Sequence, residues 1–322
     1  MKVLVISGFL GAGKTTFIRE LLKHTTRYTA VLENEFGEID LDSRDISASS
    51  KDAGLQVLEF SEGCVCCSKK DSFIYSVLTI SSGIDPEYLI VEPSGIARLG
   101  NIMAGLEKIR YEKIDPIKPA VIISLPNYFL NLQDHRELME NQVRNAGYAV
   151  YSKGAGVDPD IIEEVSRSIR SLNPDIQIAG LYGPETPEEW WKQFFREEGS
   201  SRGSGRYTEE YGADGFEQMG ITDLEFGSLG ELAAFCEEIV RGRYRSIARV
   251  KGTACAGGQT CRVDIADNSY VITGGTAPLQ MVFIGKNIDR IRLYRRCKKD
   301  LRLGFMSAER SDKGQKKIRR HP

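Results

Sequence analysis

The chain has 322 residues, of which 41% are hydrophobic and 27% are charged, and its formal net charge is −2. This length allows two domains with a substantial buried core, and the composition is that of a soluble globular protein. The small net charge gives no global reason to bind nucleic acid or an anionic membrane, so we expect neither partner. No apolar run approaches the roughly 20 residues that span a bilayer, and the N-terminal run is too short for a signal peptide, so we expect a cytoplasmic protein.

Apolar strands alternate with amphipathic helices along the first half of the chain. Expected strands are 2–7, 29–36, 55–60, 88–92, 120–125, 147–152 and 176–181, with helices over 15–25, 71–81, 133–143 and 158–174. The last helix begins with Asp158 as a cap and Pro159 at its first position. This alternation predicts an α/β fold with a mainly parallel sheet covered by helices on both faces.

The composition changes after residue 183, where Gly, Ser and Glu become frequent and an exposed arm is expected over 198–218. A small α+β unit follows. Its helices are expected at 228–242 and 287–301, and its strands at 246–254, 261–266, 269–274 and 281–285. The basic tail is expected to be disordered. The predicted domains are therefore 1–183, a partly flexible linker or arm 184–221, the α+β domain 222–304, and the tail 305–322.

The segment GFLGAGKT, residues 8–15, fits the pattern G-x-x-x-x-G-K-[ST] between a predicted strand and a predicted helix. Such a loop points backbone N–H groups and a helix N-terminus at phosphates. Lys14 is expected to reach the β and γ phosphates, Thr15 to bind Mg²⁺ through its hydroxyl, and Thr16 to contact the α-phosphate. The other expected nucleotide-binding residues of the loop are Gly8, Gly11, Ala12 and Gly13.

The segment LIVEPSG, residues 89–95, ends a predicted strand with a carboxylate. Glu92 is expected to orient the attacking water, and the Gly95 amide to sense the γ-phosphate. Lys14 and Glu92 are the candidate catalytic residues.

The segment ENEFGEID, residues 33–40, also ends a predicted strand, and it holds Glu33, Glu35, Glu38 and Asp40. These carboxylates repel one another unless a cation lies near them. A solvated acidic turn is the alternative interpretation. The position at the carboxyl end of a parallel strand favours a functional site.

Three cysteines, Cys64, Cys66 and Cys67, lie within SEGCVCCSKKD, residues 61–71. Adjacent cysteines rarely pair with each other, and in a reducing compartment such a cluster more often binds metal or does redox chemistry. Thiolates favour Zn²⁺ and other borderline or soft metals, and a carboxylate or solvent can complete a three-cysteine site. Lys69 and Lys70 would lower the thiol pKa values. The remaining cysteines are expected to be small buried hydrophobes: Cys236, Cys255, Cys261 and Cys297.

In this order, GFLGAGKTT, ENEFGE, GCVCC and a strand ending in EPSG resemble the CobW-type family of P-loop GTPases, relatives of the maturation factors UreG and HypB. LNPDIQI (172–178), RVKG (249–252) and FIGKNIDRIRL (283–293) also resemble family segments. The resemblance covers residues 1–182 and, more weakly, 222–303. It implies a P-loop NTPase fold followed by a small C-terminal α+β domain.

The resemblance also implies a function. GTP binding and hydrolysis to GDP, with Mg²⁺, would gate the capture and release of a transition metal, and a client protein or a cobalamin-type cofactor pathway would receive it. Zn²⁺ is the expected metal, with Co²⁺ or Ni²⁺ as alternatives, and a nucleotide-dependent homodimer is common among the relatives. Carried over by position, Lys14, Thr15 and Glu92 serve the nucleotide chemistry. The implied metal ligands are Cys64, Cys66 and Cys67 with Glu33 or Glu38.

The chain departs from the family pattern in two places. The guanine-recognition motif, usually Asn-Lys-x-Asp, falls on Ser152, Lys153 and Ala155, so only the lysine is retained and guanine preference is left open. Asp158 could substitute after a local shift, but a helix cap also explains it. The second departure is the lack of a histidine-rich loop: each histidine is expected to be a surface or packing residue, and these are His24, His135 and His321.

Two other functions fit parts of the pattern. One is a nucleotide-dependent activator of a corrinoid or other metalloenzyme without metal transfer, in which the cysteines serve redox chemistry or shape the fold. The other is a P-loop kinase of a small molecule, which is disfavoured because the sequence shows no arginine-rich lid.

Overall fold

The computed structural model describes residues 1–34, 55–59, 70–111, 113–195, 207, 215–266, 268–276 and 278–298, with backbone alone at 34, 55–59 and 70–72. The chain divides into two compact units, Met1–Gln218 and Met219–Pro322. No helix of the described ranges combines the length and the apolar character that a membrane crossing needs. The expected tail 305–322 and most of the expected arm lie outside the described residues.

The first unit is built on a parallel sheet with the strand order β3-β2-β4-β1-β6-β7-β8, and β5 pairs with β1. The central strands are buried from end to end, which explains their continuous apolar sequences. The strands are β1 (Lys2–Gly8), β2 (Thr29–Asn34), β3 (Leu55–Glu59), β4 (Tyr88–Pro93), β5 (Asp115–Pro116), β6 (Ala120–Ser124), β7 (Tyr148–Ser152) and β8 (Gln177–Leu181).

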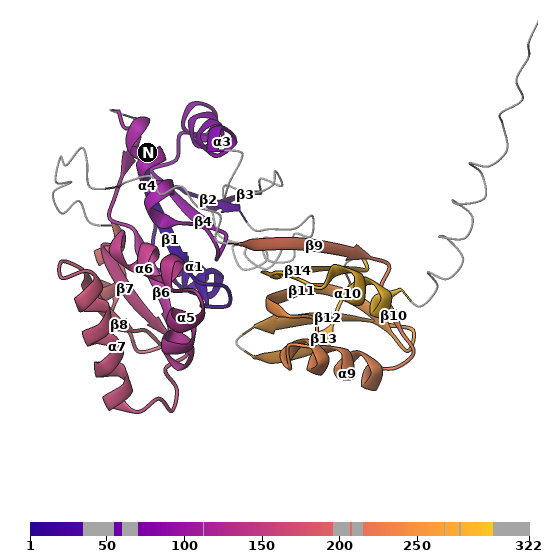
Figure 1. The fold of residues 1–322 in the computed structure, drawn as a ribbon. Helices are drawn as coiled ribbons and strands as arrows, with labels where there is room; N and C mark the ends of the chain where they lie inside the picture. The colour runs from indigo at the N-terminus through magenta and orange to yellow at the C-terminus, as the bar shows by residue number, and fades with distance from the viewer. Residues whose placement is uncertain are drawn as a thin grey trace, which may run out of the picture. The chain divides into compact units, whose positions relative to one another are not determined.

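Helices cover both faces of this sheet, which confirms the predicted α/β class (Figure 1). Neighbouring helices α3, α4, α6 and α7 contact one another in that order, whereas α1 packs in a separate core cluster with α8. The helices are α1 (Lys14–Lys23), α3 (Lys70–Gly83), α4 (Leu99–Lys108), η1 (Leu125–Asn127), α5 (Tyr128–Asp134), α6 (Arg136–Arg144), α7 (Pro159–Leu172), α8 (Glu188–Lys192) and η2 (Gln193–Phe195).

An aromatic cluster fills the core beside α1. The ring of Phe17 has its centroid 5.3 Å from that of Phe194 and 5.7 Å from that of Trp191. Both partners come from 188–195, which sequence reasoning placed in the linker 184–221, yet both are almost fully buried. Large aromatic side chains bury enough apolar surface to fold this short segment onto the domain, although the Gly- and Glu-rich sequence around it suggested a linker.

The second unit holds an α+β arrangement with the strand order β13-β12-β11-β14-β9, and β10 pairs with β11. The pairings of β11 with β12 and β14, and of β12 with β13, are antiparallel. Its elements are β9 (Phe216–Thr222), β10 (Glu225–Phe226), α9 (Leu229–Val240), β11 (Ser246–Ala256), β12 (Gln259–Ala266), β13 (Ser269–Gly274), β14 (Gln280–Lys286) and α10 (Arg290–Cys297).

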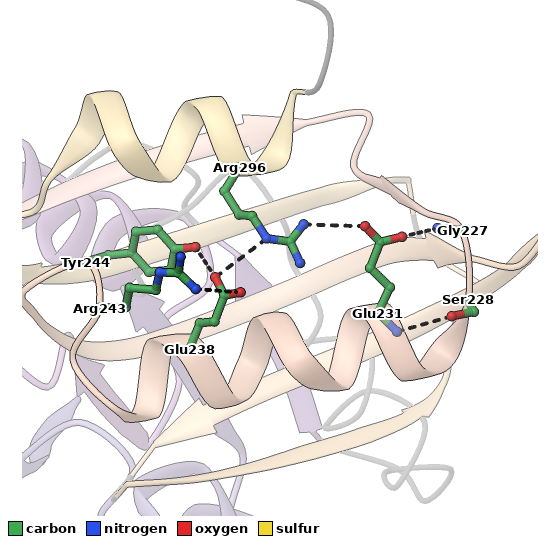
Figure 2. A network of polar contacts seen from close by, with 7 residues as sticks. All are labelled: Gly227, Ser228, Glu231, Glu238, Arg243, Tyr244 and Arg296. Atoms are coloured by element: carbon green, nitrogen blue, oxygen red, sulfur yellow. Dashed lines mark hydrogen bonds and ion pairs between the residues drawn. The ribbon is translucent and has the colours of Figure 1, made fainter.

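A network of ion pairs joins α9 to α10 (Figure 2). The guanidinium group of Arg296, on α10, lies 3.5 Å from a carboxylate oxygen of Glu231 and 3.5 Å from one of Glu238. Arg243 pairs with Glu238 at 3.1 Å, and the Tyr244 hydroxyl donates to the same carboxylate. Burial and this carboxylate raise the pKa of Tyr244. The network therefore fixes α10 on the α9 side of the second sheet.

Candidate nucleotide site

The predicted phosphate-binding segment, residues 8–15, forms the connection between β1 and α1, as expected from its pattern. Its loop is called the phosphate-binding turn. The turn is closed by a hydrogen bond from the Ala12 N–H to the Phe9 carbonyl, 3.1 Å long. Gly13 caps α1 at φ 94°, a left-handed conformation that favours glycine. Because this cap residue is a glycine, it makes no side-chain cap hydrogen bond to the first N–H groups of α1, the groups that bind an anion in such a turn. Gly8 and Gly11 flank this turn, and Thr16 is exposed on the first turn of α1.

The first turn of α1 is joined directly to the end of β4. The Thr15 hydroxyl donates to Oε1 of Glu92 at 2.9 Å, while Lys14, the preceding residue, is 92% buried. A hydroxyl that donates its proton keeps its lone pairs for a cation. Hydroxyl and carboxylate oxygens are ligands that Mg²⁺ prefers. Thr15 and Glu92 therefore form a donor pair that suits Mg²⁺, while the role of Glu92 in orienting water stays a prediction.

Three glutamates share one level of the sheet. Glu33 is the register partner of Glu92 on one side and of Glu59 on the other, at the carboxyl ends of β2, β4 and β3. Glu33 and Glu92 are both more than 90% buried. Buried carboxylates on neighbouring strands repel each other and favour a nearby cation. The strand end that carries Glu33 is thus electrostatically suited to a metal.

The other predicted metal ligands lie outside the described residues: Glu38, Cys64, Cys66 and Cys67. Among the described residues, no group of three or more His, Cys, Asp or Glu side chains is placed to hold a metal ion. The metal site therefore stays a prediction, with Glu33 as its one predicted ligand whose position is known.

The loop after β4 lies against the phosphate-binding turn. A Cβ on Gly95 would come within 2.6 Å of the Leu10 backbone nitrogen, so a larger residue would push the two loops apart. From α6, the buried Gln142 side-chain amide donates to the carbonyls of Gly95 and Ala97 at 3.3 and 3.2 Å. This side chain therefore fixes the loop that carries the predicted γ-phosphate sensor.

Gln142 was not among the residues predicted from the sequence. It lies among Leu138, Met139 and Val143 on the buried side of α6. Gln142 follows Leu138 by four residues and Met139 by three, so helical periodicity places it on the buried side of α6. Because a buried amide needs hydrogen-bond partners, this spacing was the signal in the sequence.

His135 also contacts the phosphate-binding turn. Its ring stacks on Phe9 with centroids 4.8 Å apart and an angle of 25°. His24 stacks on Trp191 at 4.6 Å and lies 2.7 Å from a Glu188 carboxylate oxygen. Both described histidines are therefore packing residues in this structure.

Ser152 lies at the end of β7, beneath the phosphate-binding turn. Its hydroxyl oxygen is 2.6 Å from the Ala12 carbonyl and 3.2 Å from that of Ile123. Lys153 follows in the left-handed region at φ 55° with its side chain exposed. Of the two predicted nucleotide-binding residues, Ser152 is therefore buried and supports the turn, whereas the side chain of Lys153 is exposed.

Comparisons with known proteins give the family of the nucleotide-binding domain. The family model described as CobW/HypB/UreG, nucleotide-binding domain, matches residues 2–179. The chain is 36% identical over 107 residues to zinc chaperone YjiA of Escherichia coli (strain K12), covering 31% of this chain and 32% of that protein. It is 30% identical over 177 residues to zinc chaperone YeiR of the same strain, covering 54% and 53%.

A third relative is zinc-regulated GTPase metalloprotein activator 1 of Dictyostelium discoideum, 26% identical over 215 residues, covering 55% of this chain and 45% of that protein. The chain thus spans between about a third and about half of the length of these relatives. Among solved structures, Zn(II)-bound YjiA GTPase from E. coli aligns over 92% of this chain and 97% of that chain, with 16% identity and a TM-score of 0.46.

Proposed function

Since the chain belongs to the CobW/HypB/UreG nucleotide-binding-domain family, we propose that it is a GTP-hydrolysing metallochaperone. It captures a transition metal, with Zn²⁺ as the first candidate, and delivers it to a client protein or a cofactor pathway. The names of three relatives, two zinc chaperones and a zinc-regulated GTPase metalloprotein activator, support both the metal and the nucleotide. The observation that carries the proposal is the Thr15–Glu92 hydrogen bond. It joins the phosphate-binding helix to the row of carboxylates that includes Glu33.

In the nucleotide half of the mechanism, the turn before α1 binds the phosphates through N–H groups and Lys14. Mg²⁺, when bound, neutralises charge that develops on the phosphates. Thr15 and Glu92 would hold that ion, and Glu92 would also orient the attacking water. The Gly95 loop, fixed by Gln142, would sense the γ-phosphate, because it already lies against Leu10 of the phosphate-binding turn.

In the metal half, the proposed ligands are Cys64, Cys66 and Cys67 with Glu33 or Glu38. Glu33 and Glu92 are register partners on adjacent strands. A change in charge or position at Glu92 therefore occurs one strand away from Glu33, the proposed metal ligand. A nucleotide that repositions the end of β4 would change the electrostatic environment of Glu33 and thereby the metal affinity. An incomplete cysteine shell suits a metal that must leave again, since structural zinc sites are usually closed.

The metal assignment is tested by titrating the full chain with Zn²⁺ against a chromophoric chelator. We expect stoichiometric binding in the wild type and a loss of at least about tenfold in affinity for Cys66→Ala, as one ligand is removed. The matched control is Cys255→Ala, which changes a partly exposed cysteine of the second unit. Wild-type protein that binds no Zn²⁺ at micromolar concentration contradicts the chaperone. If that protein still hydrolyses GTP, the activator without metal transfer explains it better.

A phosphate-release assay distinguishes the small-molecule kinase. GTP hydrolysis in the absence of any added acceptor is expected for a GTPase. A requirement for an acceptor would favour the kinase and contradict the proposal.

A further inference from the structure

The phosphate-binding turn has two sides on which the base of a bound nucleotide could lie. On the β2 side, the sheet edge carries Glu33 and Glu92, which a metal and Mg²⁺ are proposed to use. The opposite side is formed by the loops that follow β7 and β8, and Ser152 connects the first of these loops to Ala12. Ligands of open parallel sheets bind beyond the carboxyl ends of strands. We therefore expect residues 152–158 to adjoin the base when a nucleotide is bound.

We propose that this segment supports the phosphate-binding turn but does not discriminate guanine from adenine. The selectivity-determining position is Ala155, which offers a methyl group where a guanine-selective site needs an acceptor. This inference rests on the nucleotide site of the proposed function and specifies its base selectivity. GTP and ATP bind with similar affinity.

Discrimination depends on the hydrogen-bonding edges of the two bases. Guanine presents donors at N1 and at its 2-amino group, whereas adenine presents a donor at N6 and none at these positions. A protein selects guanine when a fixed acceptor, best a carboxylate, meets those two donors. A site built in this way rejects an analogue that lacks the donors by about 10⁴-fold or more.

Residues 152–155 provide no side-chain acceptor for this purpose. The Ser152 hydroxyl donates to the Ala12 carbonyl at 2.6 Å and the residue is 94% buried, so burial beneath the turn keeps its lone pairs away from a base. Lys153 carries an ammonium group, which donates and cannot accept. Gly154 has no side chain, and Ala155 is exposed without a polar atom.

The nearest carboxylate along the chain has another role. Asp158 is the N-cap of α7, where its Oδ1 accepts from the Asp160 N–H at 2.9 Å and Pro159 occupies the first helical position. Moving this side chain toward the base would remove the cap of the helix. The structure therefore supports the cap interpretation of Asp158.

One further carboxylate lies in the loop that follows β8. Glu185 is exposed in the turn between β8 and α8, which is closed by a hydrogen bond from the Gly183 N–H to the Thr186 hydroxyl, 2.7 Å long. Glu185 is the alternative source of guanine selectivity, and the variant Glu185→Gln tests it.

The experiment displaces a fluorescent nucleoside diphosphate from the full chain with GDP, IDP or ADP, each with Mg²⁺. We expect GDP and ADP affinities within about tenfold of each other in the wild type, and GDP and IDP to be equal, since nothing reads the 2-amino group. In Ala155→Asp, GDP is expected to gain at least about tenfold over both ADP and IDP, because one charge-assisted acceptor is restored. Ala155→Asn is the uncharged matched control and should gain less.

A wild-type preference for GDP over ADP above a hundredfold would overturn this proposal. If Glu185→Gln then abolishes that preference, Glu185 after β8 is the group that recognises guanine. If it does not, another group of the site recognises guanine. The proposal fails in either case. A chain that binds neither nucleotide contradicts the nucleotide site and both proposals, whereas a chain that binds GDP alone contradicts the lack of selectivity and leaves the proposed function standing.

Discussion

At the residue scale, Glu92 connects the two halves of the proposed mechanism. Its carboxylate accepts from Thr15 on α1, and its register neighbour is Glu33 on β2. Both carboxylates are more than 90% buried, so each is sensitive to a charge change at the other. A single side chain therefore lies between the nucleotide chemistry and the expected metal.

The variant Glu92→Gln tests this position. The amide oxygen can still accept from Thr15, but the negative charge that would orient water is lost. We expect GTP affinity to change less than about threefold while single-turnover hydrolysis slows by about 10²-fold or more, the usual contribution of such a group. Glu87→Gln, at an exposed carboxylate just before β4, is the control. Unaltered hydrolysis by Glu92→Gln would refute the assigned role.

Two buried thiols give a prediction about pH. Burial raises the pKa of Cys236 and of Cys297 to about 12. In the unfolded chain these thiols titrate near their ordinary value of about 8.5. Because the folded pKa is raised, the neutral thiol's contribution to stability is complete below about pH 8.5 and is lost as the pH rises toward 12.

The thiolate is the reactive form. We expect both cysteines to react with iodoacetamide far more slowly in the native protein than in the denatured chain at pH 9, with peptide mass spectrometry to assign each site. Equal native and denatured rates would show that these thiols are not buried.

At the scale of elements, α6 fixes the loop after β4. Gln142→Met keeps the side-chain length but removes both hydrogen bonds to the loop. We expect GTP affinity to be nearly unchanged and hydrolysis to fall about tenfold or more, since the two lost hydrogen bonds together correspond to about 1–3 kcal/mol. Arg136→Gln, on the exposed side of the same helix, is the control. A loss of GTP affinity equal to the loss of rate would mean that the residue acts on binding and not on the loop.

The network between α9 and α10 makes a stability prediction. Arg296→Met retains an apolar stem near Phe226 and Phe235 but removes both ion pairs with α9. We expect a loss of about 1–3 kcal/mol in the free energy of unfolding of the second unit, because two partly buried carboxylates lose a cation. Urea-dependent labelling of Cys297 measures this change. Arg295→Met, exposed on the same helix, should leave the labelling curve in place.

At the scale of the whole molecule, local patterns predicted most of the fold. Apolar runs such as 88–92 and 120–125 are strands because they are buried on both faces, and Asp158-Pro159 begins α7 as a cap and first turn. The segment 188–195 was missed, since its folding depends on Phe17, far away in the sequence. The same reason hid Gln142 and the Ser152–Ala12 contact: their partners are set by the sheet and not by neighbouring residues. The phosphate-binding turn was predictable because its sequence is local.

The central claim is that nucleotide controls metal affinity. The most direct test measures the Zn²⁺ affinity of the full chain with a non-hydrolysable GTP analogue, with GDP, and without nucleotide, all in the presence of Mg²⁺. We expect Zn²⁺ affinities that differ between the analogue and GDP by at least about fivefold, and Zn²⁺ must change the ratio of analogue affinity to GDP affinity by the same factor. Tight Zn²⁺ binding that is identical in all three states would contradict nucleotide-gated capture and release.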